Sequence, residues 1–222
     1  MTTAPATHPR TDHRGEVRRK AMLEAACELF LERGFGGTSM GDVVARSGGS
    51  LATLYATFGS KEKLFEAIVE EVSEQLLAPL DAPDFESKPL DEALCRLGEA
   101  FLSHLLDPQT LRWQRMCAAE GPKFPELRAA LLHSGPERVR GRLAAYLAAQ
   151  AEAGRLALDD PHAAAVHFLA LVKSEVAFAA VCGEPIDLAP EAVPGKVQSA
   201  VDVFLYGYAA RRARSGRTPR RS

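Results

Sequence analysis

Hydrogen-bond donors are closely spaced in one short stretch of the chain, where Ser50, Thr53, Tyr55, Thr57 and Lys61 follow one another. Hydroxyl, phenol and ammonium groups of this kind bind phosphate oxygens. Lys61 stands in the first turn of an expected helix, where the helix dipole disfavours a positive charge unless a phosphate lies nearby. A solvated surface lysine is the alternative interpretation of Lys61. The chemistry that these residues indicate is binding to a phosphate backbone.

Two short helices joined by a tight turn are expected to position these groups. Ser39 can cap the first helix, and Asp42 three residues later completes the pattern of a capping box. Gly48 supplies the left-handed residue that ends this helix, and Ser50 caps a second helix over residues 51–58. The layout is that of a helix-turn-helix, which places its second helix in the DNA major groove.

The second helix is predicted to have a buried side and a small, apolar outer side. Leu54 and Phe58 are four residues apart and therefore share the face that packs on the core. The residues left to face outward are Leu51, Ala52, Thr53, Tyr55, Ala56 and Thr57. None is an Arg, Lys, Asn or Gln, the side chains that read guanine or adenine bidentately. Methyl contacts to thymines, phosphate contacts and DNA shape are therefore expected to provide recognition.

The surrounding residues carry a family resemblance. A helix over residues 16–33 ends at Gly34, and Ser60 caps a further helix. The matching pieces are Ala25-Ala26-Cys27-Glu28-Leu29-Phe30, Arg33-Gly34-Phe35, Thr38-Ser39, Gly48, Thr53-Leu54-Tyr55, Phe58 and Ser60-Lys61-Glu62. With them, the run from Arg18 to Phe65 resembles the DNA-binding domain of the TetR/AcrR family of bacterial transcriptional regulators. The resemblance implies phosphate contacts for Tyr55 and Lys61.

The resemblance also places Thr38, a competing helix cap, at the backbone-facing end of its helix. The full expected DNA-binding set is Thr38, Ser39, Ser50, Leu51, Ala52, Thr53, Tyr55, Thr57 and Lys61. Some positions depart from the family pattern. Gly49 replaces a common Val, so we expect a looser turn, and Leu51 and Ala52 replace a frequent Lys and Gly.

The charge distribution agrees with a DNA-binding N-terminal part. The whole chain has a net charge of −2, but residues 10–63 contain 9 basic and 7 acidic residues. Residues 64–210 contain 12 basic and 22 acidic residues, so this part is expected to face away from DNA. The tail, residues 211–222, adds six arginines, which either increase non-specific DNA affinity or only increase solubility.

The remainder of the chain is predicted to be helical throughout, because no segment alternates at period two. We therefore expect an all-α protein of about nine helices, a three-helix helix-turn-helix domain followed by a helical bundle. The expected division is a disordered arm (1–14), the DNA-binding domain (15–62), a ligand-binding and dimerisation domain (63–210) and a basic disordered tail (211–222).

The second domain resembles the AefR-type regulatory domain of some TetR-family repressors. The resemblance rests on Phe124-Pro125-Glu126-Leu127, Gly135-Pro136-Glu137-Arg138, Gly154-Arg155-Leu156 and Asp159-Asp160-Pro161. It implies a homodimer formed through the last two long helices, and a dimer also suits a palindromic operator. The helix over residues 160–183 is apolar over much of its circumference, which fits either an interface or a central core helix.

The same resemblance implies a small-molecule effector bound within the helical domain. Candidate ligand-binding residues are apolar or aromatic side chains with isolated polar neighbours: Phe101, His104, Trp113, Met116, Cys117, His167, Leu171, Glu175 and Phe178. Ordinary core packing is the alternative for the aromatic residues, and hydrogen-bonded helix positions are the alternative for the histidines.

Several functional classes are disfavoured. The sequence has no nucleophile elbow, P-loop, dinucleotide-binding glycine run or metalloprotease motif, so we expect neither an enzyme nor a cofactor. The four cysteines have no zinc spacing, and we expect free thiols, with a redox sensor as the alternative. No signal peptide or membrane span is predicted, which indicates a cytoplasmic protein. We predict a ligand-released repressor; an activator or a protein-interaction module without DNA binding are the alternatives.

Overall fold

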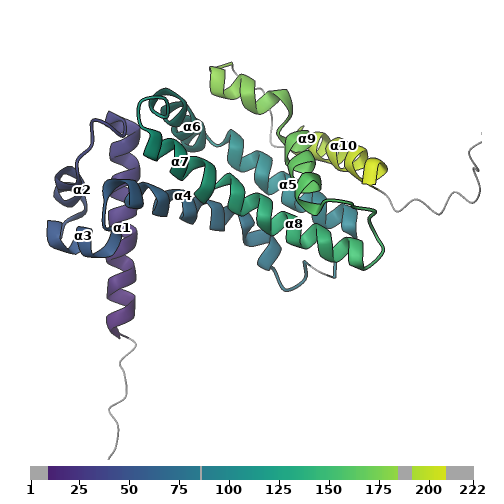
Figure 1. Ribbon diagram of the computed structural model, residues 1–222, viewed down its shortest axis with the longest axis horizontal. Coiled ribbons are helices and arrows are strands. Elements are labelled where there is room, and N and C mark those ends of the chain that lie inside the picture. The colour runs from purple at the N-terminus through teal and green to yellow at the C-terminus, as the bar shows by residue number, and fades with distance from the viewer. Residues whose placement is uncertain (1–9, 86, 185–191, 209–222) are drawn as a thin grey trace, which may run out of the picture. The chain divides into compact units, whose positions relative to one another are not determined.

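The computed structural model describes residues 10–85, 87–184 and 192–208 (Figure 1). Within these ranges the chain forms ten α-helices and one 3₁₀ helix and contains no β-strand, which confirms the all-α prediction. The helices are α1 (Arg10–Arg33), α2 (Met40–Ser47), α3 (Leu51–Phe58), α4 (Lys61–Leu77), η1 (Ala78–Asp81), α5 (Leu90–Leu106), α6 (Pro108–Glu120), α7 (Pro125–Ser134), α8 (Pro136–Glu152), α9 (Pro161–Cys182) and α10 (Ala192–Tyr208).

Helix α1 is longer than expected at its N-terminal end. It begins at Arg10, inside the segment 1–14 that was expected to be disordered. The apolar stripe that predicts the helix begins only at Met22, but no proline interrupts residues 10–21, so the helix continues upstream through polar residues. The expected disorder of residues 1–9 and of the basic tail 211–222 lies outside the described residues.

The chain divides into two compact units whose boundaries differ from the expected border at residues 62 and 63. The first unit ends at Val72 and also includes Arg112–Gly135, and the second contains Ser73–Leu111 and the chain from Pro136 onward. The borders therefore fall within α4 and α6. Sequence periodicity could not reveal this division, because it depends on which helices pack together rather than on where each helix begins.

An aromatic cluster forms the centre of the first unit. Phe65 of α4 stacks on Trp113 of α6, with ring centroids 5.1 Å apart and planes inclined by 12°. Phe35, in the loop after α1, meets Phe65 edge-on at 5.8 Å and Phe124 at 5.3 Å. The ring centroids of Phe30 and Trp113 are 6.4 Å apart. Aromatic side chains bury large areas, so the α6–α7 segment is part of the core beneath α1.

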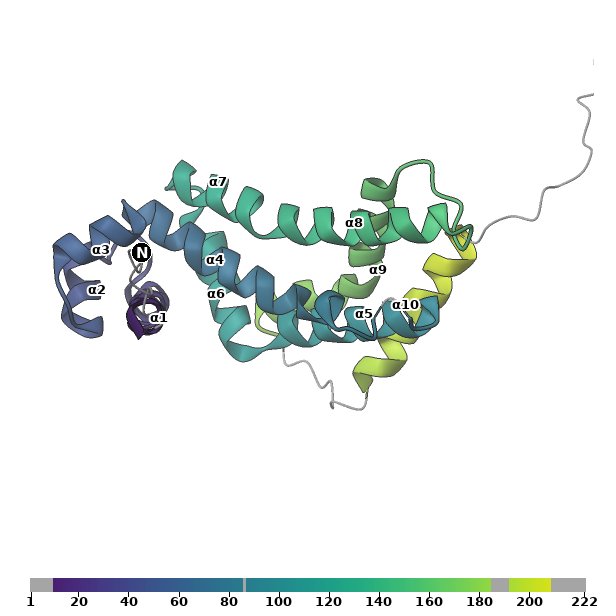
Figure 2. The same cartoon turned by 90° about the horizontal axis from the view of Figure 1, so that it is seen from below.

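The second unit packs α5, α8, α9 and α10 around a separate core of mainly Leu, Val, Ala and Phe side chains. Figure 2 shows α10 lying against α5, and the two helices are in extensive contact. The approach is closest at Gly98 of α5, where an added Cβ would lie 2.6 Å from Cγ1 of Val197. Gly98 therefore sets the distance between α5 and α10.

Helix α9 is bent in the middle. Ser174 has φ +43° and ψ −164°, a conformation that an L-residue rarely adopts, and the segments on either side differ in direction by 59°. The long helix expected over residues 160–183 is thus two shorter pieces. No single helix among the described residues is long and apolar enough to cross a membrane, although the bent pair of α9 segments passes the same test of length and composition.

Replacing Gly98 by Ala should lower the free energy of unfolding by about 1–3 kcal/mol, because the new methyl group would overlap the Val197 side chain. Gly141→Ala is a matched control in α8, where an added Cβ meets nothing within 4 Å. There the higher helix propensity of Ala should increase stability by about 0.5–1 kcal/mol. Urea denaturation measures both. Equal effects at the two positions would contradict close packing at Gly98.

Candidate nucleic-acid interface

The two predicted helices of the helix-turn-helix are present with their predicted caps. Ser39 caps α2, its side chain accepts a hydrogen bond from the amide of Asp42, and the Asp42 carboxylate accepts from the amide of Ser39 at 2.9 Å. Ser50 caps α3 by accepting from the amide of Thr53 at 3.1 Å. These local bonds fix the N-terminal end of each helix without help from distant residues.

The turn between α2 and α3 has two successive glycines with positive φ. Gly48 has φ +77° and Gly49 has φ +96°. A valine, which the family pattern favours at position 49, is a genuine outlier at positive φ because its branched Cβ clashes with the backbone. A Cβ at Gly49 would lie 3.6 Å from the Met22 side chain, an ordinary contact, so backbone conformation rather than space requires glycine.

Helix α3 buries one side and exposes the other, as its sequence predicts. Leu54 is fully buried and Phe58 is 8% exposed, whereas Leu51 and Tyr55 are 45% and 47% exposed. Ala52 and Thr57 are also exposed. An outer face with a phenol and small apolar groups is therefore available on a rigid helix.

The threonine hydroxyls of α3 are already engaged within the helix. Thr57 Oγ1 donates to the carbonyl of Thr53 at 2.8 Å, and Thr53 Oγ1 shares a 2.8 Å hydrogen bond with the hydroxyl of Ser50. The methyl groups are then the parts of these side chains that take no part in intrahelical bonding. This arrangement is consistent with apolar contacts rather than hydrogen-bonded readout.

Thr38 lies inside the first unit rather than on its outer surface, unlike the other expected DNA-binding residues. It is 2% exposed, and its hydroxyl donates to the carbonyls of Gly34 at 2.9 Å and Leu29 at 3.2 Å. A buried hydroxyl needs such partners, so the side chain ties the α1–α2 loop to the end of α1. The sequence could not distinguish this role from a cap, because both use a threonine before a helix.

Lys61 is directed toward the same loop. Its ammonium nitrogen donates to the carbonyl oxygens of Phe35 at 2.8 Å and Thr38 at 3.0 Å, and it lies 4.3 Å from the centroid of the Phe35 ring. A lysine has three N–H donors, so one remains for a phosphate. The unfavourable position of this charge in the first turn of α4 is thus offset by two backbone carbonyls.

Glu120 at the end of α6 and Phe124 just after it hold the same loop, through contacts that the sequence did not indicate. The carboxylate of Glu120 accepts a hydrogen bond from the amide of Gly36 at 3.1 Å, and this bond is the main reason why its pKa is lowered. A Cβ on Gly36 would lie 2.8 Å from the Phe124 ring. Glu120 and Gly36 are 84 residues apart, so no local pattern could have predicted their contact.

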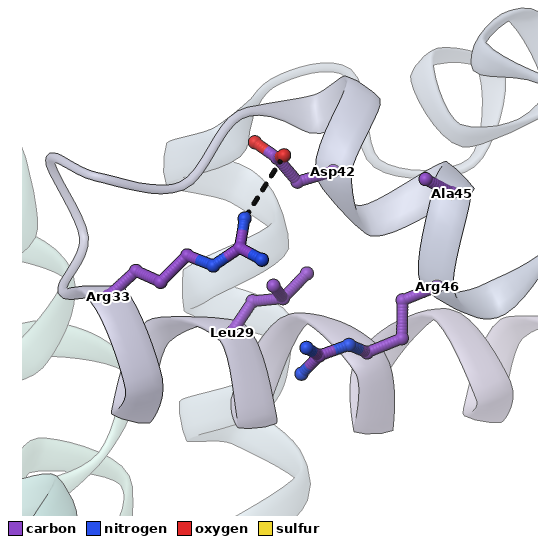
Figure 3. Close-up of a pocket in the computed structure, with 5 residues that line it drawn as sticks. All are labelled: Leu29, Arg33, Asp42, Ala45 and Arg46. Atoms are coloured by element: carbon purple, nitrogen blue, oxygen red, sulfur yellow. Dashed lines mark hydrogen bonds and ion pairs between the residues drawn. The ribbon is translucent and has the colours of Figure 1, made fainter.

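Two arginines attach α2 to α1 through carboxylates around a pocket of about 240 Å³ (Figure 3). Arg46 of α2 makes two hydrogen bonds to Glu32 of α1, at 2.8 and 2.7 Å, and this pairing lowers the pKa of Glu32. Arg33 of α1 reaches Asp42 of α2 at 3.2 Å. Figure 3 shows Leu29 between the two guanidinium groups. These cations are therefore engaged in holding the motif together.

The expected ligand-binding residues are divided between the two units. Trp113, Met116 and Cys117 belong to the core of the first unit, and burial raises the pKa of Cys117 to about 12. Core packing, the alternative interpretation, describes these three residues. A ligand site in the second unit does not include them.

The remaining candidates lie in the second unit with differing exposure. Phe101 packs against its core, and burial lowers the pKa of His104. His167 is hydrogen-bonded to the hydroxyl of Tyr208 at 2.5 Å. Leu171 and Phe178 are 37% and 72% exposed, and the side chain of Glu175 lies outside the described residues. No group of three potential metal ligands occurs in the part of the chain that the structure describes.

Comparison with known proteins identifies the family. Residues 22–68 match the family described as bacterial regulatory proteins, tetR family, and residues 92–210 match the C-terminal domain of AefR-like transcriptional repressors. The second match alone covers more than half of the chain. The chain belongs to the TetR family of bacterial transcriptional regulators. The helix-turn-helix that begins at Ser39 is accordingly its DNA-binding domain.

Individual relatives agree with this membership. This chain is 35% identical to the flavonoid-responsive regulator FrrA. The match covers 88% of this chain and 99% of the FrrA chain, with a TM-score of 0.73. A TetR-family regulator from Mesorhizobium loti has a TM-score of 0.75 at 23% identity over 88% of this chain and 98% of its own, which shows a shared fold. The repressor Rv3405c of Mycobacterium tuberculosis is 35% identical over 108 residues, 48% of this chain and 57% of its own length. The chain thus spans little more than half of that curated relative.

Lys61→Met should lower the free energy of unfolding by about 1–3 kcal/mol in the absence of DNA, because the carbonyls of Phe35 and Thr38 lose a charged donor. Lys63→Met is the matched control, since Lys63 is exposed and pairs only with Glu66 on the surface, and it should change stability little. Urea denaturation measures both. An unchanged stability in Lys61→Met would mean that the lysine serves DNA alone.

The stability that the capping box provides should depend on pH. Hydrogen bonds from the hydroxyl and amide of Ser39 hold the pKa of Asp42 below its ordinary value of 3.8. A carboxylate with a lowered folded-state pKa stabilises the protein above its unfolded pKa, and this contribution is lost as the pH falls through the folded value. Asp42→Asn should therefore unfold at a lower urea concentration than the wild type near about pH 6, and the gap should be smaller at about pH 3, where an unperturbed Asp is mostly protonated. A gap of the same size at both pH values would refute the assignment.

Proposed function

We propose that this TetR-family protein is a repressor that binds a palindromic operator as a homodimer, with α3 in the major groove, and is released by a small molecule. The observation that carries the proposal is the outer face of α3. It is exposed and capped at Ser50, and Leu54 and Phe58 anchor it to the core. A recognition helix needs this combination of an open face and a rigid base.

Base recognition is proposed to rest on methyl groups. The exposed side chains at the N-terminal end of α3 are Leu51 and Ala52, and the hydroxyl of Thr53 is occupied within the helix. Apolar groups of this kind contact the C5-methyl of thymine, and the remaining specificity comes from phosphate contacts and DNA shape. Tyr55 and Lys61 are proposed to bind phosphates. Ser39, Ser50 and Thr57 are proposed to join them by exchanging the hydroxyl hydrogen bonds that they make within α2 and α3 for phosphate oxygens.

The homodimer is proposed to form through α9 and α10. Both helices expose large apolar side chains, and packing them against a second copy would remove their apolar area from water. These are Val166, Leu171 and Phe178 on α9, and Val203 and Tyr206 on α10, with Phe178 72% and Tyr206 92% exposed. A two-fold dimer places its two recognition helices one DNA turn apart, about 34–36 Å, which is why the operator is expected to be palindromic.

The effector is proposed to bind in the second unit. FrrA, with 35% identity over nearly its whole length, is described as flavonoid-responsive, so flavonoids are the first compounds to test. The proposed residues are Phe101, His104, His167 and Glu175 of the second unit. Leu171 and Phe178, also expected at the ligand site, are exposed and are assigned to the dimer interface instead. Binding there would weaken DNA binding by changing the spacing of the two helix-turn-helix motifs, because the ligand favours one of two conformations.

The experiment is a fluorescence-anisotropy titration of the protein against the DNA immediately upstream of its own coding sequence. Tyr55→Phe removes only the phenol hydroxyl from the exposed face of α3 and should weaken binding by about 3- to 20-fold, the value of one hydrogen bond. Tyr146→Phe removes the same group from α8, outside α3 and the two proposed dimer helices, and should leave binding unchanged. Addition of a flavonoid series then tests release.

The outcomes separate the candidate functions. Tight, salt-sensitive binding to a palindrome that Tyr55→Phe weakens and Tyr146→Phe does not would support the proposal. Equal binding by all three proteins would remove α3 from the interface. Absence of specific binding to any fragment in a genome-wide selection would favour the alternative, a helix-turn-helix module that binds another protein.

A further inference from the structure

Most of the basic side chains of helices α1 to α4 already have a partner within the protein. Ion pairs join Arg19 to Glu16 and Glu71, Lys20 to Glu24, Arg33 to Asp42, Arg46 to Glu32, and Lys63 to Glu66. Lys61 is bound to two backbone carbonyls. Helix α3 itself contains no basic residue. The helix-turn-helix therefore has few free positive charges for the phosphates of the DNA that it is proposed to bind.

Arg14 and Arg18 of α1 differ from these side chains because they form no ion pair among the described residues. Both are exposed, and among the described residues neither has a carboxylate within ion-pair distance. They precede Met22, the first buried residue of α1, by eight and four residues, so at 1.5 Å per residue Arg14 stands about 12 Å beyond the core. Two neighbouring, unneutralised guanidinium groups on one rigid helix form an anion-binding surface.

The contacts of the next turn show which side of α1 carries these residues. Met22 faces the α2–α3 turn, since its terminal carbon lies 3.6 Å from the Cβ position of Gly49. Arg19 lies over the ring of Phe58 at the end of α3, 5.8 Å from its centroid. Each four-residue step rotates a helical position by about 40°, so Arg18 stays on the helix-turn-helix side and Arg14 lies on its flank. Figure 1 shows the N-terminal end of α1 running past α3.

We propose that Arg14 and Arg18 form a second DNA contact surface, which binds the phosphate backbone flanking the base pairs that α3 reads. This inference rests on the proposed function, since it requires that α3 face DNA. Charge complementarity selects the partner, because a duplex presents one negative charge for about every 1.7 Å of its axis. The surface adds affinity without sequence preference, because phosphates carry no base information. It supplies the free cations that α3 lacks.

The test compares full-length variants by salt titration. The probes are a random-sequence duplex of about 40 base pairs and the DNA upstream of the coding sequence. Arg14→Gln/Arg18→Gln removes both charges with little change in helix propensity. Lys20→Gln is the control, because Lys20 is exposed on the opposite side of the same helix. Circular dichroism and thermal melting verify folding, and single Arg14→Gln and Arg18→Gln variants repeat the measurement with less disturbance.

The slope of log K against log salt should decrease by about 0.9 for each lost phosphate contact, hence by about 2 per subunit in the double variant, on both probes. Lys20→Gln should keep the wild-type slope. A hydroxyl-radical footprint on the upstream DNA should lose protection only at its outer edges. If the wild type binds but the double variant retains its slope and footprint, the inference is overturned and the proposed function stands. If the wild type shows no salt-dependent binding, both fail together.

Discussion

The α1–α2 loop is the constraint on which the DNA-binding unit depends. Its carbonyls at Phe35 and Thr38 accept hydrogen bonds from Lys61, and its amide at Gly36 donates to Glu120. The two carbonyls are partly buried, where water reaches them poorly, so partners within the protein stabilise them. Helices α4 and α6 provide those partners. Because α2 and α3 follow directly, the position of the loop decides how α3 is presented.

This constraint explains why α6 and α7 belong to the unit that carries the helix-turn-helix. Trp113 stacks on Phe65, and Phe124 packs against Phe35, so the aromatic core is incomplete without the segment 112–135. The segment lies between stretches of chain that belong to the second unit. The position of α6 and α7 therefore helps to fix the α1–α2 loop.

The basic side chains of the DNA-binding unit either hold its helices together or remain available for phosphates. Arg33 and Arg46 are used to join α2 to α1 through carboxylates, and Lys61 is used to hold a loop. Such pairing keeps α2 and α3 in place but removes positive charge from the surface that would meet phosphates. A basic count in the sequence is therefore a poor guide to DNA affinity, because only the tertiary structure separates cations that are paired from those that are free.

Local signals in the sequence determined the caps at Ser39 and Ser50, the glycine stop at Gly48 and the buried pair Leu54 and Phe58, because hydrogen bonds and periodicities within a few residues decide them. The tertiary structure alone decided that Thr38 is buried, that Lys61 binds carbonyls, and that Trp113 serves the DNA-binding core. Each of these depends on residues far apart in the chain. A single sequence records which groups need partners, but only the folded chain shows which partners they find.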